Sequence, residues 1–170
     1  KQRKFKILLA ASRDAWQIAD LLAKEKVPVI FDNVFTLPQR DTDPHDIHFR
    51  AAGILHKAGV KIAHSEAMGS WGASRVRNIV YAAAKSIAHG LPREAALRSL
   101  TLHPAQMLNV ADRLGSLTPK KEATFIAVDG DIFDIRTNIK HMWIDGKKVS
   151  LQSRHTRLYE KCKNRPKLIK

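Results

Sequence analysis

Short apolar segments that alternate with amphipathic helical patterns constrain the fold of this 170-residue chain most strongly. Three such segments lie at residues 6–12, 27–31 and 60–64, and helical spacing of apolar residues fills 14–25 and 44–58. Strands that alternate with helices of this length form parallel βαβ units, and continuously apolar strands are typical of a sheet covered on both faces. The pattern therefore predicts an α/β fold, either part of a barrel or an open doubly wound sheet.

The second half of the chain changes its pattern. Helices are predicted over residues 76–89, 93–100 and 104–108, with Gly90 ending the first of them. Strands are then predicted over 124–128, 139–144 and 147–151, with Asp145-Gly146 as a hairpin turn, before a terminal helix over 154–163. A small antiparallel β unit is thus expected after the α/β part.

The net charge of +14 raises the question of a polyanionic partner. Much of this charge sits at the two ends, since residues 1–6 hold four basic groups and no acid, and residues 154–170 hold seven basic groups and one acid. Basic tails of this kind can bind polyanions, but they are more often solvated termini. Because no zinc-finger spacing, RNP-type strand or GXXG loop is present, the sequence argues against nucleic-acid recognition.

Cysteine content and hydropathy limit the cross-links, metal sites and membrane segments that this chain can contain. Cys162 is the only cysteine, so an internal disulfide and a thiolate-rich zinc site are both excluded. No apolar run approaches the roughly 20 residues that a membrane span requires. We expect a soluble protein of the cytoplasm or periplasm with no membrane partner.

Three stretches of the second half carry a family resemblance. They are residues 90–97 with Thr101 and Pro104-Ala105, residues 112–119 followed by Asp129-Gly130-Asp131, and residues 144–149. In order and spacing they resemble the helix pair after the last barrel strand, the return into the small β domain and the closing hairpin of the amidohydrolase family. The likeness is greatest to the imidazolonepropionase-like branch, and it covers nearly the whole chain.

The resemblance implies an architecture. Residues 7–12, 27–31 and 60–65 would be the last three strands of a TIM-type (β/α)8 barrel, whose active site lies at the C-terminal ends of the strands. Residues 1–111 would form this C-terminal portion of the barrel, residues 112–153 part of a small β-sandwich built from both chain ends, and residues 154–170 a basic helix and tail. The missing N-terminal part of the barrel would then be the first partner of this chain.

The same resemblance implies an activity. Family members hydrolyse C–N bonds of amides or cyclic amides in small-molecule substrates with water activated by a divalent metal, for which zinc is favoured. Their ligands are a His-x-His pair on the first strand, histidines on the middle strands and an aspartate after the last strand, which also handles the proton. This chain contains no His-x-His, and no aspartate follows the segment 60–65.

Glu66 is the candidate to replace that aspartate as metal ligand and catalytic proton acceptor, with His64 as a further ligand of metal or substrate. The alternative is a solvated loop carboxylate beside a half-buried histidine. Asp32 and Asn33, at the end of the second strand, are candidates for substrate contact.

Two further features carry weaker interpretations. Arg40 is a candidate to hold a substrate carboxylate by a bidentate contact, against the alternative of a surface pair with Asp41. His45 and His48 have a spacing that can share a metal, but they lie away from the expected mouth and are interpreted as surface or capping histidines.

Three functions remain open. The chain belongs to an active hydrolase, to a catalytically degenerate scaffold or partner subunit of the same fold, or to a basic polyanion-binding module. Three strands of an eight-stranded barrel leave sheet edges exposed. We therefore expect the isolated chain to be inactive and prone to association, with a homo-oligomer as one form of it.

Overall fold

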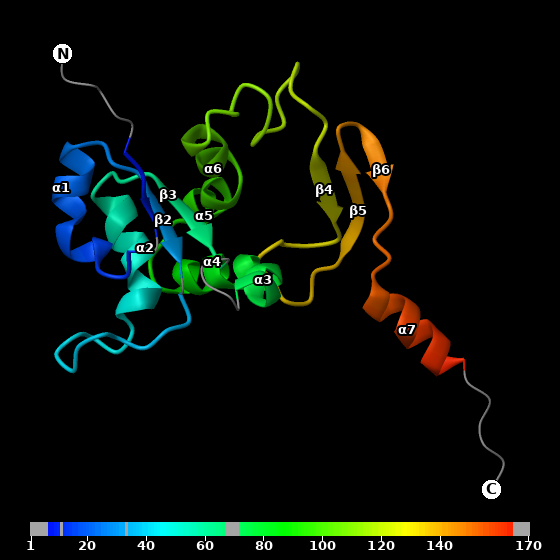
Figure 1. The fold of residues 1–170 in the computed structure, drawn as a ribbon, viewed down its shortest axis with the longest axis horizontal. Helices are drawn as coiled ribbons and strands as arrows, with labels where there is room; N and C mark the ends of the chain where they lie inside the picture. The colour runs from blue at the N-terminus through cyan, green and yellow to red at the C-terminus, as the bar shows by residue number, and fades with distance from the viewer. Residues whose placement is uncertain (1–6, 11, 33, 67–71, 165–170) are drawn as a thin grey trace, which may run out of the picture.

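The computed structural model describes residues 7–10, 12–32, 34–66 and 72–164 (Figure 1). Its first part contains a three-stranded parallel sheet of β1 (Leu9–Ala10), β2 (Val29–Asp32) and β3 (Ile62–Ser65), with β2 in the middle. Leu9 pairs with Val29, and Val29 pairs with Ile62. The predicted parallel βαβ arrangement is confirmed.

The connections between these strands are helical, as predicted, but their starts differ from the prediction. The first consists of a 3-10 turn, η1 (Ala15–Ile18), followed by α1 (Ala19–Lys24). The second helix, α2 (Ile47–Lys57), begins after Asp46 and not at Pro44. The carboxylate of Asp43 accepts a hydrogen bond from Arg40 at 3.4 Å and does not cap a helix, so residues 41–46 form turns.

One face of the parallel sheet carries the hydrophobic core. Val29, Phe31 and Ile62 are almost fully buried there against helix residues such as Leu55 and Ala96. On the opposite face Ala10 is exposed, and Ile30 and Ser65 are only partly buried. The helices therefore cover one face of the sheet thoroughly and the other face incompletely.

Five short elements follow β3: α3 (Gly72–Arg75), η2 (Val76–Asn78), α4 (Ile79–Ala88), α5 (Arg93–Leu100) and α6 (Leu102–Met107). The first turn of the predicted helix 76–89 is a 3-10 turn. Helix α6 begins at Leu102, two residues before Pro104. The first turn of a helix tolerates proline because the N–H groups there have no intrahelical acceptors. His103 in this helix donates from Nδ1 to the carbonyl of Ile62 at 2.9 Å, which fastens α6 to β3.

The second part of the chain is the predicted antiparallel unit of β4 (Phe125–Val128), β5 (Ile139–Ile144) and β6 (Lys147–Val149). Asp145 and Gly146 both have positive φ, 50° and 72°, as the tight hairpin requires. The rings of Phe125 and Trp143 stack with their centroids 4.7 Å apart. Yet no residue from 108 to 164, all of which are described, is fully buried, so this sheet has no core of its own.

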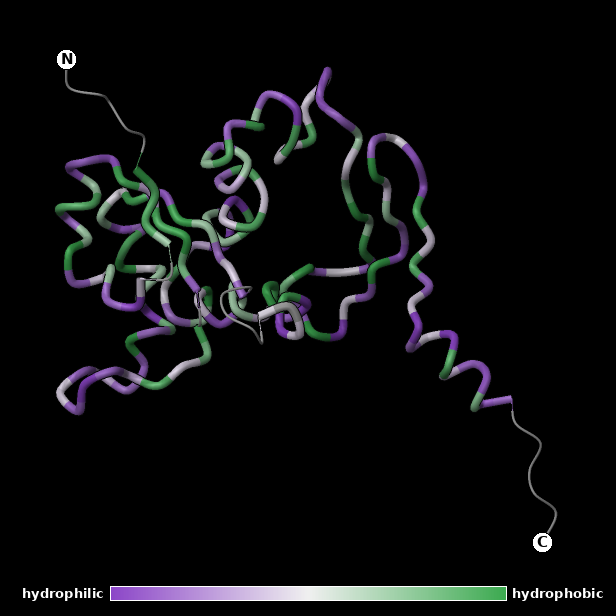
Figure 2. Tube along the Cα trace, in the orientation of Figure 1, coloured by the Kyte–Doolittle hydropathy of each residue, from purple (hydrophilic) through white to green (hydrophobic). Residues whose placement is uncertain are grey.

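The terminal helix α7 (Arg154–Lys163) matches its predicted limits. Ser153 caps it by accepting a hydrogen bond from the N–H of Thr156 at 3.2 Å. The helix extends away from the rest of the protein, and Figure 2 shows it as mostly hydrophilic, in contrast to the parallel strands. Among the described residues, no helix combines the length and apolarity needed to cross a bilayer.

Candidate active site

Two buried carboxylates lie at the C-terminal edge of the parallel sheet. Asp32 ends β2 and pairs in register with Ser65, and Glu66 follows Ser65 directly. Because the C-terminal ends of parallel strands share one edge, Asp32 and Glu66 come together there, and they are only 4% and 3% exposed. We call these two residues the carboxylate pair.

The electrostatics of the pair are those of a partly desolvated acid. Burial raises the pKa of Glu66, the charge of Arg75 in α3 partly offsets this, and the charge of Asp32 raises the pKa further. The Oε1 atom of Glu66 is buried and accepts no hydrogen bond within the described part of the chain. A carboxyl group with a raised pKa is suited to accepting and returning a proton near neutral pH.

His64 does not join this pair. Its Nδ1 lies 2.7 Å from the Oγ of Ser99 in α5, and its Nε2 lies 3.2 Å from the Oγ of Ser86 in α4. The ring packs edge-on against Phe31 on the helix-covered face of the sheet. This geometry argues against the expectation that His64 binds metal or substrate, because serine hydroxyls lie within hydrogen-bond distance of both ring nitrogens.

Arg40 is also engaged with residues of this chain. Its guanidinium binds Asp14 at 2.7 Å and Asp43 at 3.4 Å, which ties the loop after β2 to the segment after β1. The alternative interpretation, a surface pair with Asp41, names the wrong carboxylate, since Arg40 binds Asp14 and Asp43. These two contacts also occupy the groups that a bidentate contact to a substrate carboxylate would use, and so argue against that prediction.

The remaining predicted positions are of three kinds. Asn33 lies outside the described residues. His45 lies in a turn before α2, and not on the helix as predicted. His48 is on α2 but is 2% exposed, so its interpretation as a surface or capping residue is wrong; burial lowers its pKa.

Comparison with known proteins decides the family. The sequence profile of the amidohydrolase family matches residues 18–149. This chain belongs to the amidohydrolase family. The finding confirms the resemblance that the sequence motifs indicated.

Similar sequences include two with informative names. Residues of the chain are 36% identical over 70 residues to the amidohydrolase tasK of Hapsidospora irregularis, a match over 41% of this chain and 7% of that protein. They are also 36% identical over 61 residues to a putative N-acetylgalactosamine-6-phosphate deacetylase of Escherichia coli strain K12, over 36% of this chain and 34% of that protein.

Solved structures show the same fold. An amidohydrolase from Thermotoga maritima MSB8 superposes with a TM-score of 0.71 at 27% identity, over 86% of this chain and 37% of that chain. An adenosine deaminase from Xanthomonas campestris with bound zinc superposes with a TM-score of 0.59 at 17% identity, over 92% of this chain and 41% of that chain. The TIM-barrel class fits these neighbours, and this amidohydrolase chain spans well under half of the length of each.

A divalent metal is general in this family, so the carboxylate pair must be tested as a place to hold one. Carboxylates are ligands that zinc and harder divalent cations accept, and the unused Oε1 of Glu66 has that character. However, the described residues hold no group of three or more His, Cys, Asp or Glu side chains able to bind a metal. The pair therefore fits part of a metal site, and the described residues do not complete one.

The serine partners of His64 were not anticipated from the sequence. Ser86 and Ser99 are completely buried, and each lies on the apolar stripe of its helix, beside Ala82 or Ala95. A serine on such a stripe signals a buried polar partner. Read in this way, the helical periodicity would have indicated a polar contact for both positions without naming His64.

Proposed function

We propose that this chain is the C-terminal part of a metal-dependent amidohydrolase that hydrolyses a C–N bond of an amide or cyclic amide in a small molecule. In this proposal β1, β2 and β3 are the last three strands of the barrel. The observation that carries it is the buried carboxylate pair at the C-terminal edge of three parallel strands, within a segment that the family profile matches.

Two features of the packing support an incomplete barrel. One face of the parallel sheet leaves Ala10 exposed and Ile30 only partly buried, although the interior of a closed barrel is filled by side chains. The β4–β5–β6 sheet has no fully buried residue, as expected of one half of a sandwich. The other strands of the barrel and a second small sheet would cover these surfaces.

Glu66 has the central chemical role in this proposal. A bound metal would polarise the substrate carbonyl and acidify water. Glu66 would accept the proton of the attacking water and return it to the leaving nitrogen, with its pKa raised by burial and Asp32 and lowered by Arg75. Asp32 would remain beside Glu66, and its carboxylate would contact the cation or the substrate.

The experiment begins with the protein isolated from its natural source, whose intact mass we expect to exceed 19.1 kDa. Loaded with zinc and assayed against a panel of N-acyl amino acids, N-acetyl sugars and cyclic amides, it should hydrolyse at least one of them. Glu66→Gln should lower kcat by a factor of about 100 or more, since general acid–base catalysis contributes about that much.

The matched control is Glu94→Gln, which removes an exposed carboxylate of α5 that pairs only with Arg98 among the described contacts. It should leave the rate unchanged. Full activity of Glu66→Gln would remove the catalytic role of Glu66, and an intact mass of 19.1 kDa would remove the C-terminal assignment.

A degenerate scaffold of the same fold is the second candidate. The observation in its favour is that His64 faces Ser86 and Ser99, so the end of β3 offers no imidazole to a metal. In this case the whole protein would bind no stoichiometric zinc and hydrolyse no member of the panel. Elemental analysis beside the same assay separates the two candidates.

A further inference from the structure

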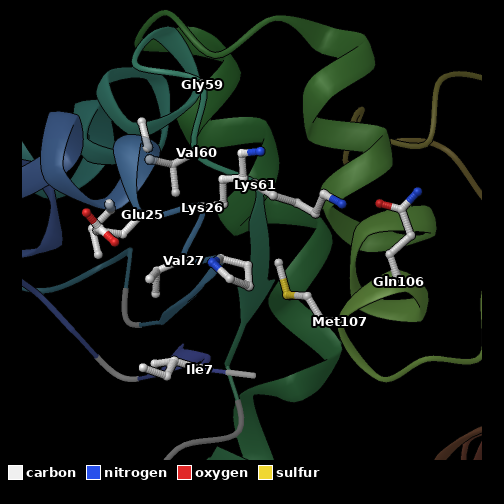
Figure 3. A pocket seen from close by; sticks show the side chains of 12 residues that line it. Ile7, Glu25, Lys26, Val27, Gly59, Val60, Lys61, Gln106 and Met107 are labelled. Carbon is white, nitrogen blue, oxygen red and sulfur yellow. The ribbon is translucent and has the colours of Figure 1, made fainter. Parts of the chain in front are cut away.

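A pocket lies at the opposite end of the parallel sheet from the carboxylate pair, where the strands begin (Figure 3). Its volume is about 810 Å³, which is within the range of small-molecule sites. The walls come from the end of α1, the segments that lead into β2 and β3, and α6. It therefore combines segments that are distant in the sequence.

The floor of this pocket is apolar and built from the core. Leu22 and Val60 belong to the buried cluster under the helices, Val27 packs against that cluster, and Met107 of α6 closes one side. The floor of the pocket therefore continues the helix-covered core of the sheet.

The polar part of the lining is mainly cationic. Lys26 and Lys61 both line the pocket, and in the view of Figure 3 both are labelled above Val27 and Met107. Glu25, the one acidic residue among the lining residues, lies on the flank of this view away from Gln106. An apolar floor below two ammonium groups matches a ligand that has an apolar body and an anionic head.

The backbone at Lys26 is a second, independent observation. Lys26 follows α1 with φ 54°, as Gly59 follows α2 with φ 91°. The two helix ends share one hydrogen-bond pattern: Lys26 N–H binds the carbonyl of Ala23 at 3.1 Å, as Gly59 N–H binds that of His56 at 2.9 Å. Glycine is favoured over other residues at this position by about 1 kcal/mol, so the lysine costs the fold about that much conformational free energy.

We propose that this pocket binds a small organic carboxylate with an apolar body, with Lys26 and Lys61 holding the carboxylate and the floor holding the apolar part. The left-handed turn at Lys26 ends α1 as the turn at Gly59 ends α2, and the binding role accounts for a lysine in place of the glycine that such a turn favours. The carboxylate pair lies at the far ends of the same strands, so the bound acid acts as an effector and not as the substrate.

The test titrates the intact protein, isolated from its natural source, with octanoate, 1-octanol and octylamine by calorimetry in low salt. Octanoate should bind about tenfold more tightly than 1-octanol, as a charge-assisted contact implies, and octylamine should bind most weakly. Lys61→Gln and Lys26→Gly should each weaken octanoate binding about three- to tenfold and leave 1-octanol binding unchanged.

Lys26→Gly also separates binding from folding. It should raise the melting temperature, because it relieves the positive φ, while it weakens octanoate binding. Lys24→Gln, an exposed charge of α1 that does not line the pocket, is the matched control and should change neither.

Three results would each overturn the proposal. They are equal affinity for octanoate and 1-octanol, no binding of octanoate, and unchanged octanoate affinity in the Lys26→Gly, Lys61→Gln double variant. None of these results bears on catalysis by Glu66.

Discussion

The Nδ1 atom of His64 lies 2.7 Å from the Oγ of Ser99, which is 35 residues later in the chain. The same Oγ lies 2.6 Å from the carbonyl of Ala96, to which its hydroxyl donates. The Nδ1–H of His64 then donates to Ser99, and Nε2 is left as an acceptor 3.2 Å from the hydroxyl of Ser86, which also lies 3.3 Å from the carbonyl of Ala82. A neutral imidazole thus joins β3 to both α4 and α5.

This arrangement makes the stability of the fold dependent on pH. Burial lowers the pKa of His64 from 6.5 to about 4, so the folded state binds fewer protons than the unfolded state between these values. The stabilisation is complete above pH 6.5 and is lost as the pH falls toward 4, by up to about 3 kcal/mol. Urea unfolding at intervals from pH 7.5 to pH 4.5 measures it.

The contribution of His64 can be isolated by substitution. His64→Asn should lower stability at pH 7.5 and flatten its decline toward pH 4.5, whereas His89→Asn, at a partly buried position, should keep the decline. Ser99→Ala should cost about 1–3 kcal/mol, because it leaves Nδ1–H buried without its acceptor. A wild-type decline that survives in His64→Asn would show that another group is responsible.

Gly115 is expected to be the least replaceable glycine of the second part. Its φ is 88°, and a Cβ at this position would lie 2.7 Å from the Cβ of Ala105 and 2.9 Å from the carbonyl of Thr101. Gly115→Ala should therefore cost about 2–4 kcal/mol, from backbone strain together with overpacking.

Gly146 provides the comparison for that measurement. Its φ is 72°, but a Cβ there would meet nothing within 4 Å. Gly146→Ala should cost only about 1 kcal/mol from the backbone conformation. Thermal unfolding of both variants compares the two, and an equal loss would mean that the close contacts around Gly115 relax freely.

Glu66 should reduce the stability of the fold at neutral pH. Its pKa in the folded state is raised, mainly by burial, so folding favours the protonated form and opposes ionisation. The cost is absent below the unfolded pKa of 4.5 and appears as the pH rises through the folded pKa.

Glu66→Gln should consequently unfold at a higher urea concentration than wild type at pH 7.5, with the difference vanishing near pH 4. Glu94→Gln, at an exposed position, should show no such gain. If Glu66→Gln were less stable than wild type at pH 7.5, contacts of the ionised carboxylate would stabilise the fold. Its burial would then need no functional explanation.

Association of the isolated chain follows from its uncovered apolar surfaces. Ile126 and Ile144 of the β4–β5–β6 sheet are 42% and 51% exposed, and the sheet has no core. We expect sedimentation at micromolar concentration to show oligomers or aggregates, and Ile126→Lys to reduce them. A monodisperse monomer of 19.1 kDa with a cooperative melt would count against the C-terminal assignment.

The amino-acid sequence by itself determined the elements whose signals are local. Continuous apolar runs and helical spacing predicted the three parallel strands and the order of the helices, and Asp145-Gly146 predicted the hairpin. Such features depend on neighbouring residues alone, since the side-chain period and the turn chemistry are set within a few positions. The motifs of residues 90–149 likewise identified the family that the profile match confirmed.

Only the tertiary structure decided where the chemical groups point. His64 and Glu66 lie two residues apart, yet the first faces Ser86 and Ser99 under the helices and the second lies buried beside Asp32 at the edge of the sheet. Which face a strand residue presents to the core depends on the helices that pack there, and those contacts join residues tens of positions apart. The burial that shifts the pKa values of both groups arises from the same long-range packing.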